Sequence, residues 1–436
     1  MRCSLLILAI FSTLMGWGQS HFERDFRDST LRVDYSFVGN HQQQIIALEE
    51  LRSAPKWAGR RVNLATLPLK GNGQITMRDA ETQRVIYTTS FSSLFQEWQT
   101  TEEATQISKA FENVFQLPMP KRDADVTVTL FDTRQRISAQ FTHRVKVNDI
   151  LIRPTSISHL PNHRVLHQGG DTEKCIDIAI VAEGYTSEER ELFYEHAQAA
   201  ANEILKYKPF CDYLDRINII GVALNSRESG VSAPGKGIWK QTALKSNFDT
   251  FYSERYLTTL HLKQLNDSLA GLPYEHIVIL ANTQHYGGGG IYNSYTLAAA
   301  KHAMFLPVVV HEFGHSFGGL ADEYFYDDQY EQFYFPEVEP WEQNITTLQD
   351  FSAKWKDMLP KETPIPTSTE GISESDMEHI GVFEGGGYQS KGVYRAFRDC
   401  RMRTNGVPEF CKVCQRALER LIRFYTEDLK YNKKNN

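Results

Sequence analysis

The sequence predicts a multidomain protein, with an N-terminal β-sandwich and a C-terminal α/β domain that contains a mixed sheet. Three observations carry this prediction. The length of 436 residues exceeds what one ordinary core accommodates. Short runs of alternating apolar and polar residues extend from Phe22 to about Pro161. Beyond that point, continuous apolar runs and helical patterns replace them.

The N-terminal domain is expected to span residues 21–165 and to consist mainly of strands. Its apolar residues recur with a period of two, and Gly, Asn and Asp interrupt the runs. The clearest runs are residues 31–37, 85–89, 126–130 and 138–145. The sequence of this domain contains nothing that resembles a catalytic cluster, so we expect a packing or recognition module. Residues 161–174, with Gly169 and Gly170, are the expected linker.

The second domain is expected over residues 171–430. Buried strands are predicted by continuous apolar runs at residues 176–182, 217–224 and 276–281. A helix is expected to start at Thr186 or Ser187, either of which can cap it, and to end near Tyr207. Strands that alternate with helices in this way are typical of an α/β domain with a mixed sheet.

Residues 1–20 are typical of a cleaved signal peptide. Arg2 precedes an apolar run at residues 5–15, and the small residues Gly18 and Ser20 follow it. The run is shorter than the roughly 20 residues that cross a bilayer, so we expect no membrane span. No cysteine follows it where a lipoprotein signal requires one. The protein is therefore expected to be exported, either to a periplasm or to the medium.

The charge balance restricts the partners. The formal net charge is -7, and the sequence contains no basic cluster. Both features argue against a nucleic-acid partner. We also expect a monomer.

Five cysteines lie beyond the signal peptide, namely Cys175, Cys211, Cys400, Cys411 and Cys414. In an oxidising compartment, two disulfides and one spare thiol are the first expectation. The alternative is a structural zinc site with thiolates from Cys400, Cys411 and Cys414. The sequence shows no evident fourth ligand for such a site.

The strongest chemical signal is the segment His311-Glu312-Phe-Gly-His315. Two histidines four residues apart share one helix face, so His311 and His315 can bind the same metal ion. Glu312 lies beside them and can accept a proton from a water molecule without being a ligand. An apolar run precedes the motif, and Pro307 suits the first turn of a helix. The pattern predicts one catalytic zinc ion.

A catalytic zinc site needs a third protein ligand and an open position. Gly318 and Gly319 follow the second histidine and allow the helix to end in a left-handed turn. Such a turn brings a residue six or seven positions past His315 back to the metal. Asp322 is the preferred ligand because its side chain is short. Glu323 is an alternative ligand, or a hydrogen-bond acceptor for a ligand histidine.

A run of four glycines at residues 287–290 precedes a short apolar segment. Glycines allow main chains to approach closely, so Gly288 and Gly289 could form a sheet edge that pairs with a substrate peptide. A flexible turn is the equally open alternative. Residues that could stabilise an oxyanion, or could simply be packed, are Tyr185, Tyr292, Tyr324 and Arg403. His285 and His302 are interpreted as structural or surface residues.

The motif of residues 311–318, followed later by Met402 in a Cys-Arg-Met-Arg turn, resembles the metzincin clan of zinc peptidases. In that clan a methionine-containing turn lies beneath the metal, so the resemblance implies this role for Met402. It also implies a metzincin-like fold for the α/β domain. The chain departs from the clan pattern at Ala321, where the common third histidine would stand.

The sequence is most similar to the bacterial IgA-peptidase family of metallopeptidases. The similarity covers about residues 175–425, and its most specific part is the zinc motif with its Gly-Gly-Leu-Ala-Asp-Glu-Tyr extension. Further matching segments are residues 182–186, 228–230 and 286–290 and the segment around Met402. The resemblance implies proteolysis by an exported enzyme, without implying immunoglobulin A as the substrate.

The sequence thus predicts an exported zinc-dependent endopeptidase in which Glu312 is the general base. A secreted zinc-containing protein that binds glycans or proteins without significant turnover is the alternative. The intact Glu312 argues against it, because a binding protein has no need of a base. Hydrolysis of a non-peptide amide is a third hypothesis, since the motif determines how water is activated and not which acyl group is attacked.

Overall fold

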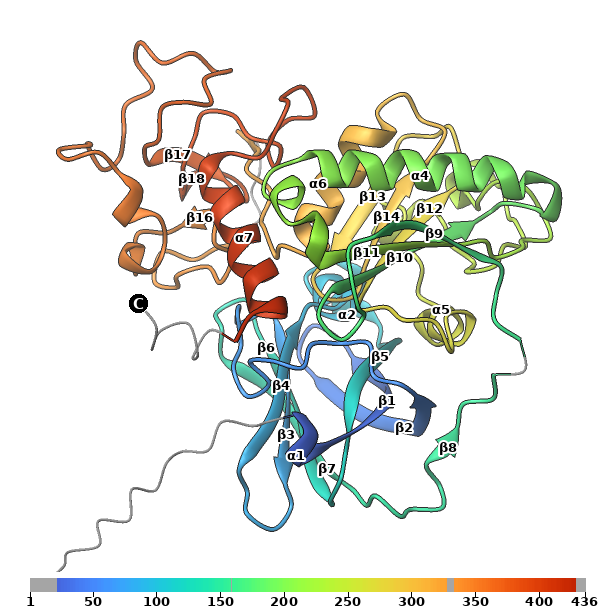
Figure 1. Cartoon of the computed structure of the whole chain (residues 1–436). Helices are drawn as coiled ribbons and strands as arrows, with labels where there is room; N and C mark the ends of the chain where they lie inside the picture. The colour runs from blue at the N-terminus through green and yellow to red at the C-terminus, as the bar shows by residue number, and fades with distance from the viewer. Residues whose placement is uncertain (1–21, 158, 328–332, 429–436) are drawn as a thin grey trace, which may run out of the picture.

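The computed structural model describes residues 22–157, 159–327 and 333–428. The predicted signal peptide at residues 1–20 lies outside the described residues. Figure 1 shows the N-terminal strands, coloured blue to teal, at one end of the molecule and the α/β domain at the other. The C-terminal half also contains a second lobe, formed by residues 325–327 and 333–395 and coloured orange. This lobe lies beside the α/β domain, and helix α7 lies between it and the central sheet.

The N-terminal domain contains two four-stranded sheets, with strand orders β5-β1-β2-β8 and β4-β3-β6-β7. The alternation of buried and half-buried residues along β3 is what a strand with one face on a core requires. Val33 of β1 and Ile75 of β3 are fully buried in one shared apolar cluster, so the two sheets pack face to face. The strands are β1 (Phe26–Gly39), β2 (Gln44–Pro55), β3 (Gly73–Asp79), β4 (Val85–Phe91), β5 (Lys109–Pro120), β6 (Ala124–Phe131), β7 (Ile137–Val145) and β8 (Arg153–Pro154).

All four strand runs predicted in this domain are confirmed, as parts of β1, β4, β6 and β7. Short helices join or precede the strands, namely α1 (Phe22–Asp25), α2 (Leu94–Trp98) and α3 (Glu103–Gln106). Ser93 caps α2 by accepting a hydrogen bond from the Gln96 amide.

The α/β domain is built on a six-stranded mixed sheet with the order β13-β14-β12-β10-β11-β9. The four central strands are parallel, and β9 and β13 are antiparallel at the two edges. The predicted mixed sheet and its three buried strands are therefore confirmed. The strands are β9 (His163–Gln168), β10 (Ile176–Glu183), β11 (Ile217–Val222), β12 (His276–Ala281), β13 (Gly288–Ile291) and β14 (Tyr295–Ala299).

The expected linker at residues 161–174 is wrong in part, because β9 lies within it and pairs with β11. The residues of β9 are mostly exposed, as expected for an edge strand whose outer side faces solvent. Such a strand lacks the apolar run by which the central strands were recognised.

Helices cover one face of the mixed sheet. Thr186 and Glu189 form a capping box that begins a 3-10 turn, and α4 (Arg190–Lys206) continues from it, as the sequence predicts. Inward residues of β10 such as Ile178 and Ile180 share one apolar cluster with residues of α4, α6 (Phe305–Ser316) and α7 (Lys412–Thr426). The remaining helix is α5 (Leu262–Ser268), and the 3-10 turns are η1 (Ser187–Glu189), η2 (Phe210–Asp212), η3 (Leu214–Arg216), η4 (Pro234–Lys236), η5 (Thr250–Tyr252), η6 (Phe351–Ala353) and η7 (Lys356–Met358).

The other face of the mixed sheet is joined to the N-terminal domain. Ala179 and Val181 of β10 and Ile277 and Ile279 of β12 belong to the same apolar cluster as the cores of the N-terminal sheets. The two domains therefore bury apolar surface against each other.

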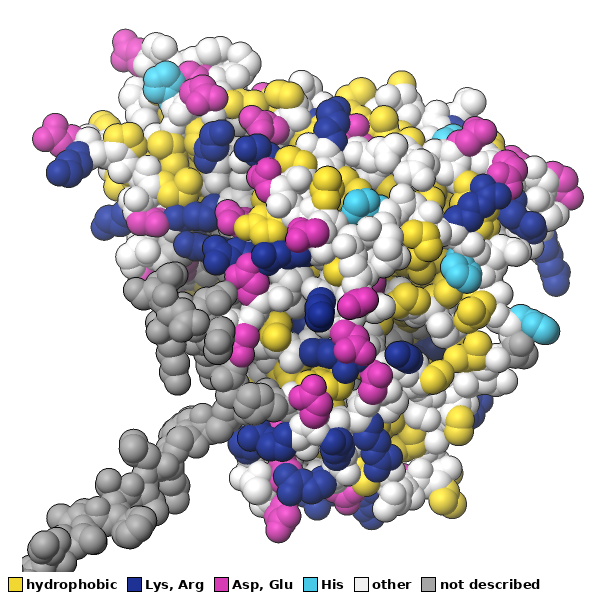
Figure 2. Space-filling model, in the orientation of Figure 1, with side chains coloured by type: hydrophobic (Ala, Val, Ile, Leu, Met, Phe, Trp, Pro, Cys, Tyr) yellow, Lys and Arg dark blue, Asp and Glu magenta, His cyan; other side chains and the backbone are white. Residues whose placement is uncertain are grey.

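The second lobe of the C-terminal half contains a small sheet in which β15, β16 and β17 all pair with the central strand β18. Its strands are β15 (Phe325–Tyr326), β16 (Ile345–Thr346), β17 (Phe383–Gly386) and β18 (Tyr388–Arg395). Among the described residues no helix has the length and apolar character to cross a bilayer. On the face shown in Figure 2, basic and acidic side chains are interspersed.

Candidate active site

Helix α6 places the two motif histidines on one face. Val309, Val310 and Phe313 point into the core, and this fixes the rotation of the helix. His311 and His315 then face outward, with side chains that are 13% and 15% exposed. Their Nε2 atoms lie 3.1 Å apart.

A left-handed turn ends α6, as the glycine pair predicts. Gly319 has φ +56°, and its N–H donates to the His315 carbonyl at 2.9 Å. The chain then reverses and brings Asp322 to the histidines. The Oδ1 atom of Asp322 lies 3.0 Å from His311 Nε2 and 3.2 Å from His315 Nε2. The structure thus brings together the three predicted ligands.

Backbone carbonyls select the tautomer of both histidines. The Nδ1 atom of His311 lies 2.8 Å from the Arg401 carbonyl, and that of His315 lies 2.6 Å from the Leu320 carbonyl. Each Nδ1 therefore carries a proton, which it donates to the carbonyl. Each Nε2 then has a free lone pair, directed at the Nε2 atom of the other histidine and at Asp322. Three converging electron-pair donors repel one another unless a proton or a cation lies between them.

The spacing of these donors fits a zinc ion. Tetrahedral zinc with nitrogen and oxygen ligands at about 2.0–2.1 Å holds its ligand atoms about 3.3 Å apart. The three observed separations are 3.0, 3.1 and 3.2 Å. Two neutral imidazoles and one carboxylate are also the donor types that zinc prefers.

The charges of the site are strongly coupled. Burial alone would raise the pKa of Asp322, but His315 and His311 hold it well below its usual range. Burial would likewise lower the pKa of His315, yet the Asp322 carboxylate raises it to about 9. Without a metal the cluster therefore holds a proton between the histidines and the carboxylate, at the place that a cation fits.

Tyr388 was not predicted and supports Asp322 from the opposite side. Its hydroxyl donates to the Oδ2 atom of Asp322, which leaves Oδ1 directed at the histidines. Tyr388 begins β18 and has φ +66°, a conformation that few non-glycine residues adopt. The run Gly385-Gly386-Gly387 before it was the available sequence signal, because it resembles the glycine run before Ile291.

Glu312 lies over the edge strand β13. A Cβ atom added to Gly288 would stand 3.1 Å from the Glu312 Oε1 atom, and one added to Gly290 would stand 2.2 Å from the Glu312 carbonyl. Close approach of the α6 main chain is thus the reason for glycine at position 290. Pairing of this strand with a substrate peptide stays a prediction. Burial raises the pKa of Glu312, and the charges on His311 and His315 oppose that shift.

Met402 lies beneath α6. The side chain is fully buried, and its Sδ would stand 2.6 Å from a Cβ added to Gly314, the residue between the motif histidines. The Met402 carbonyl accepts a hydrogen bond of 2.8 Å from the Glu323 amide. Met402 therefore packs against α6 through its side chain and binds the segment that carries Asp322 through its backbone carbonyl.

The expected roles of Glu323 at the histidines are wrong. Its side chain is 0% exposed and points away from His311 and His315. Glu323 Oε1 instead lies 2.9 Å from Asn344 Nδ2 and 3.2 Å from the sulfur of Cys414. Successive side chains of an extended segment point to opposite sides, so only one of the two neighbouring carboxylates can reach the histidines.

The expected disulfides are also absent from the described residues, since all five cysteines there are free thiols. Cys175 and Cys211 lie away from the other three. Cys400, Cys411 and Cys414 are instead gathered around Glu323.

A cleft of about 1130 Å³ contains the histidine cluster. Residues of the N-terminal domain line one wall, namely Asn72, Gln96 and Glu97. The Tyr256 hydroxyl donates to Glu97 at 2.6 Å and thereby connects the two walls. No motif marks these residues in the sequence, because each lies in a loop or a short helix.

The other predicted polar residues divide into two groups. Tyr292, Tyr324 and Arg403 line the cleft. The Tyr292 hydroxyl lies 3.4 Å from Ser90 Oγ, and its ring packs against Trp341. Tyr185 does not line this cleft, because its hydroxyl is hydrogen-bonded to His196.

Comparison with known families agrees with a hydrolytic site on an α/β domain. Residues 165–374 and 369–422 match the family described as IgA Peptidase M64, and residues 21–142 match the Peptidase M64 N-terminus. A comparison with curated proteins found no match. The fold and the match define a metallopeptidase of two domains. The chain belongs to the IgA peptidase M64 family.

Proposed function

We propose that this peptidase is an exported zinc-dependent endopeptidase with a metzincin-like centre. The observation that carries the proposal is the convergence of His311 Nε2, His315 Nε2 and Asp322 Oδ1 within 3.0–3.2 Å of one another. These three atoms would hold one zinc ion, and the cleft leaves a side of the ion open to water and substrate. Export is proposed from the signal-like residues 1–20.

When bound, the zinc ion supplies Lewis-acid activation of a water molecule and of the peptide carbonyl. Glu312 accepts the proton of the attacking water and passes it to the leaving amine. Tyr388 keeps Asp322 oriented, and the carbonyls of Arg401 and Leu320 keep the histidine tautomers that ligation requires.

The edge strand β13 supports a polypeptide substrate in extended form. Its inner side pairs with β14, and a single bridge to Tyr256 occupies only Gly288 on the outer side. Gly289 and Gly290 therefore have main chain at the wall of the cleft. A peptide that pairs there passes Glu312, because Gly288 lies against that carboxylate. Pairing through main chain suits cleavage within a polypeptide or glycoprotein.

The decisive test incubates the zinc-loaded mature chain with a diverse peptide library and identifies the cleavages by mass spectrometry. We expect internal cleavages with the wild type and none with Glu312→Gln. That variant keeps the size of the side chain and removes the base, so metal content should be unchanged while turnover falls by about 10³-fold.

The possible outcomes separate the hypotheses. Undiminished cleavage by Glu312→Gln would contradict the mechanism. Tight binding of glycans or proteins by a zinc-loaded wild type that cuts no peptide would favour the alternative of a binding protein. Cleavage of small amides but not of peptides would favour the third hypothesis.

A further inference from the structure

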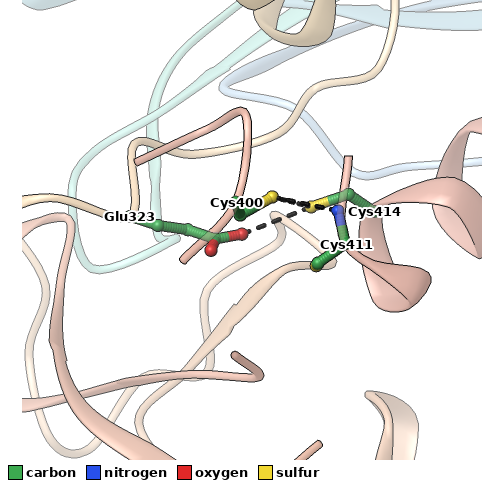
Figure 3. Close-up of side chains that lie close together, drawn as sticks. All are labelled: Glu323, Cys400, Cys411 and Cys414. Carbon is green, nitrogen blue, oxygen red and sulfur yellow. Dashed lines mark hydrogen bonds between the residues drawn. The ribbon is translucent and has the colours of Figure 1, made fainter. Parts of the chain in front are cut away.

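Four buried side chains come together below the histidine cluster. They are Glu323 from the segment after α6, Cys400 from the methionine turn, and Cys411 and Cys414 from the start of α7. Their ligand atoms all lie within 4.8 Å of one another, and none of the residues is more than 2% exposed. Figure 3 shows the Glu323 carboxylate directed at the sulfurs of Cys400 and Cys414.

Two of the distances within the cluster are close to those of a tetrahedral metal site. Zinc–sulfur bonds of about 2.3 Å hold two sulfurs about 3.8 Å apart, and a sulfur and a carboxylate oxygen about 3.6 Å apart. The sulfurs of Cys400 and Cys414 are 3.7 Å apart, and Glu323 Oε1 lies 3.2 Å from the Cys414 sulfur. The side chains thus need little movement to share one ion.

An unpartnered acceptor points independently to a ligand. Glu323 is 0% exposed, and its Oε2 atom has no hydrogen-bond partner among the described residues. A buried carboxylate oxygen without a partner is costly. A cation within the cluster would remove that cost, because a carboxylate ligand is satisfied by the metal.

The start of α7 also favours negative sulfur ligands. Cys411 is the residue before the first turn, and Cys414 is the third residue of the helix. The Cys411 N–H donates to the Cys400 sulfur at 3.3 Å. The positive end of the helix dipole and such N–H groups stabilise thiolates. A pair of cysteines separated by two residues is also the spacing that zinc sites use most often.

We propose that Cys400, Cys411, Cys414 and Glu323 hold a second zinc ion with a structural role. This site is distinct from the proposed catalytic centre and does not depend on it. All four ligands come from the protein and are buried, which is the arrangement of a structural rather than a catalytic site.

A disulfide does not explain the cluster as well. Three cysteines cannot all be paired, so any disulfide would leave one buried thiol over, and the Oε2 atom of Glu323 would still lack a partner among the described residues. Zinc uses all four side chains at once. Binding to zinc also protects thiolates from oxidation, which would be needed in an oxidising compartment.

The second ion would position the catalytic centre. Glu323 follows Asp322 directly, and its amide donates to the carbonyl of Met402, two residues after Cys400. A metal that joins Glu323 to Cys400 therefore anchors both the third catalytic ligand and the methionine turn.

The test measures zinc per chain in the full-length mature protein by elemental analysis. We expect two ions in the wild type, and one in Cys400→Ser and Cys414→Ser. Cys175→Ser is the matched control, because Cys175 is buried but lies outside the cluster, and it should keep two ions. One ion per chain in wild type and in all three variants would overturn the proposal.

A spectroscopic measurement on the wild type keeps the proposal testable if the cysteine variants do not fold. Replacing zinc by Co²⁺ should produce sulfur-to-cobalt charge-transfer absorption in the near ultraviolet, because only the second site has thiolates. After denaturation with a chelator, five thiols should react. Absence of the charge-transfer band, or a Cys400–Cys414 disulfide found by mass spectrometry of the unreduced chain, would contradict the second site.

Discussion

The neighbouring residues Asp322 and Glu323 belong to two clusters that differ in their access to solvent. Asp322 faces His311 and His315 at the wall of a cleft. Glu323 faces three cysteines in a region that solvent does not reach. Three ligands with one open side suit turnover, whereas four buried ligands suit structural support. Solvent access, as well as the types of ligand, therefore distinguishes the roles that we propose for the two clusters.

The backbone explains how adjacent residues can serve different sites. The Asp322 carbonyl accepts a hydrogen bond from the Gly387 amide, while the Glu323 amide donates to the Met402 carbonyl. The segment is thus held from two sides in an extended form, and its successive side chains point in opposite directions.

The largest effect is expected from a paired substitution of these two residues. Asp322→Ala removes a proposed metal ligand. The activity should therefore fall by more than the roughly 10–100-fold that is typical when a residue hydrogen-bonded to a metal ligand is lost. Glu323→Ala should keep the ion at the histidines and reduce activity by about 10–100-fold at most. Activity and zinc per chain, measured on both purified variants, check this prediction.

Identical behaviour of the two variants would contradict the assignment of Asp322 and Glu323 to different clusters. A weaker or shifted cobalt–sulfur absorption in Glu323→Ala, with an unchanged absorption in Asp322→Ala, is the expected signature, because Glu323 is the oxygen ligand of the cysteine cluster and Asp322 is not part of it. The reverse result would assign the two carboxylates to the wrong clusters.

The cluster of Asp322 with the two histidines could be predicted from the sequence far better than the buried cluster of Glu323 with the three cysteines. The spacing of His311 and His315 determines their common helix face, and Gly319 determines the turn that returns Asp322. Glu323 could not be placed among the cysteines, because the contact joins segments about ninety residues apart that form no motif together. For the same reason Tyr388 and Glu97 were missed. The edge strand β9 was missed because it has no buried face of its own.

A smaller effect is expected for Tyr388→Phe. The substitution removes the hydroxyl that donates to Asp322 Oδ2 and keeps the ring that packs edge-on against Tyr324. Zinc affinity at the histidine cluster should fall by about 10–100-fold. Competition with a chelator of known affinity measures this change.

Tyr324→Phe is the matched control, because it removes a neighbouring hydroxyl and leaves the Asp322 contact in place. Equal losses of affinity in the two variants would show that Tyr388 has no specific part in holding Asp322. Cobalt–sulfur absorption should be unchanged in both, since neither hydroxyl touches the cysteine cluster.

Asp177 provides a control for the argument about Glu323, because it is a buried carboxylate that belongs to no group of three or more potential metal ligands among the described residues. It is 3% exposed and lies on β10, and its Oδ1 accepts a hydrogen bond from Asn218. Its Oδ2 atom, like the Oε2 atom of Glu323, has no hydrogen-bond partner among the described residues. No group of metal-ligating side chains surrounds it in that part of the chain. We therefore expect a proton, and not a metal ion, to neutralise this carboxylate. Burial raises the pKa of Asp177 to about 7.

The smallest effect, on stability alone, is expected for Asp177→Asn. Below about pH 4 the carboxyl is protonated in both the folded and the unfolded chain, so it imposes no penalty. Between pH 4 and 7 only the unfolded chain ionises, and the wild type loses up to about 4 kcal/mol. The amide stays neutral but leaves an N–H unpaired, at a cost of about 1–3 kcal/mol. Thermal unfolding should therefore find the variant less stable than the wild type at pH 4 and more stable at pH 8. A difference that keeps one sign across this range would show that Asp177 is ionised in the folded protein and has a partner there, as we propose for Glu323.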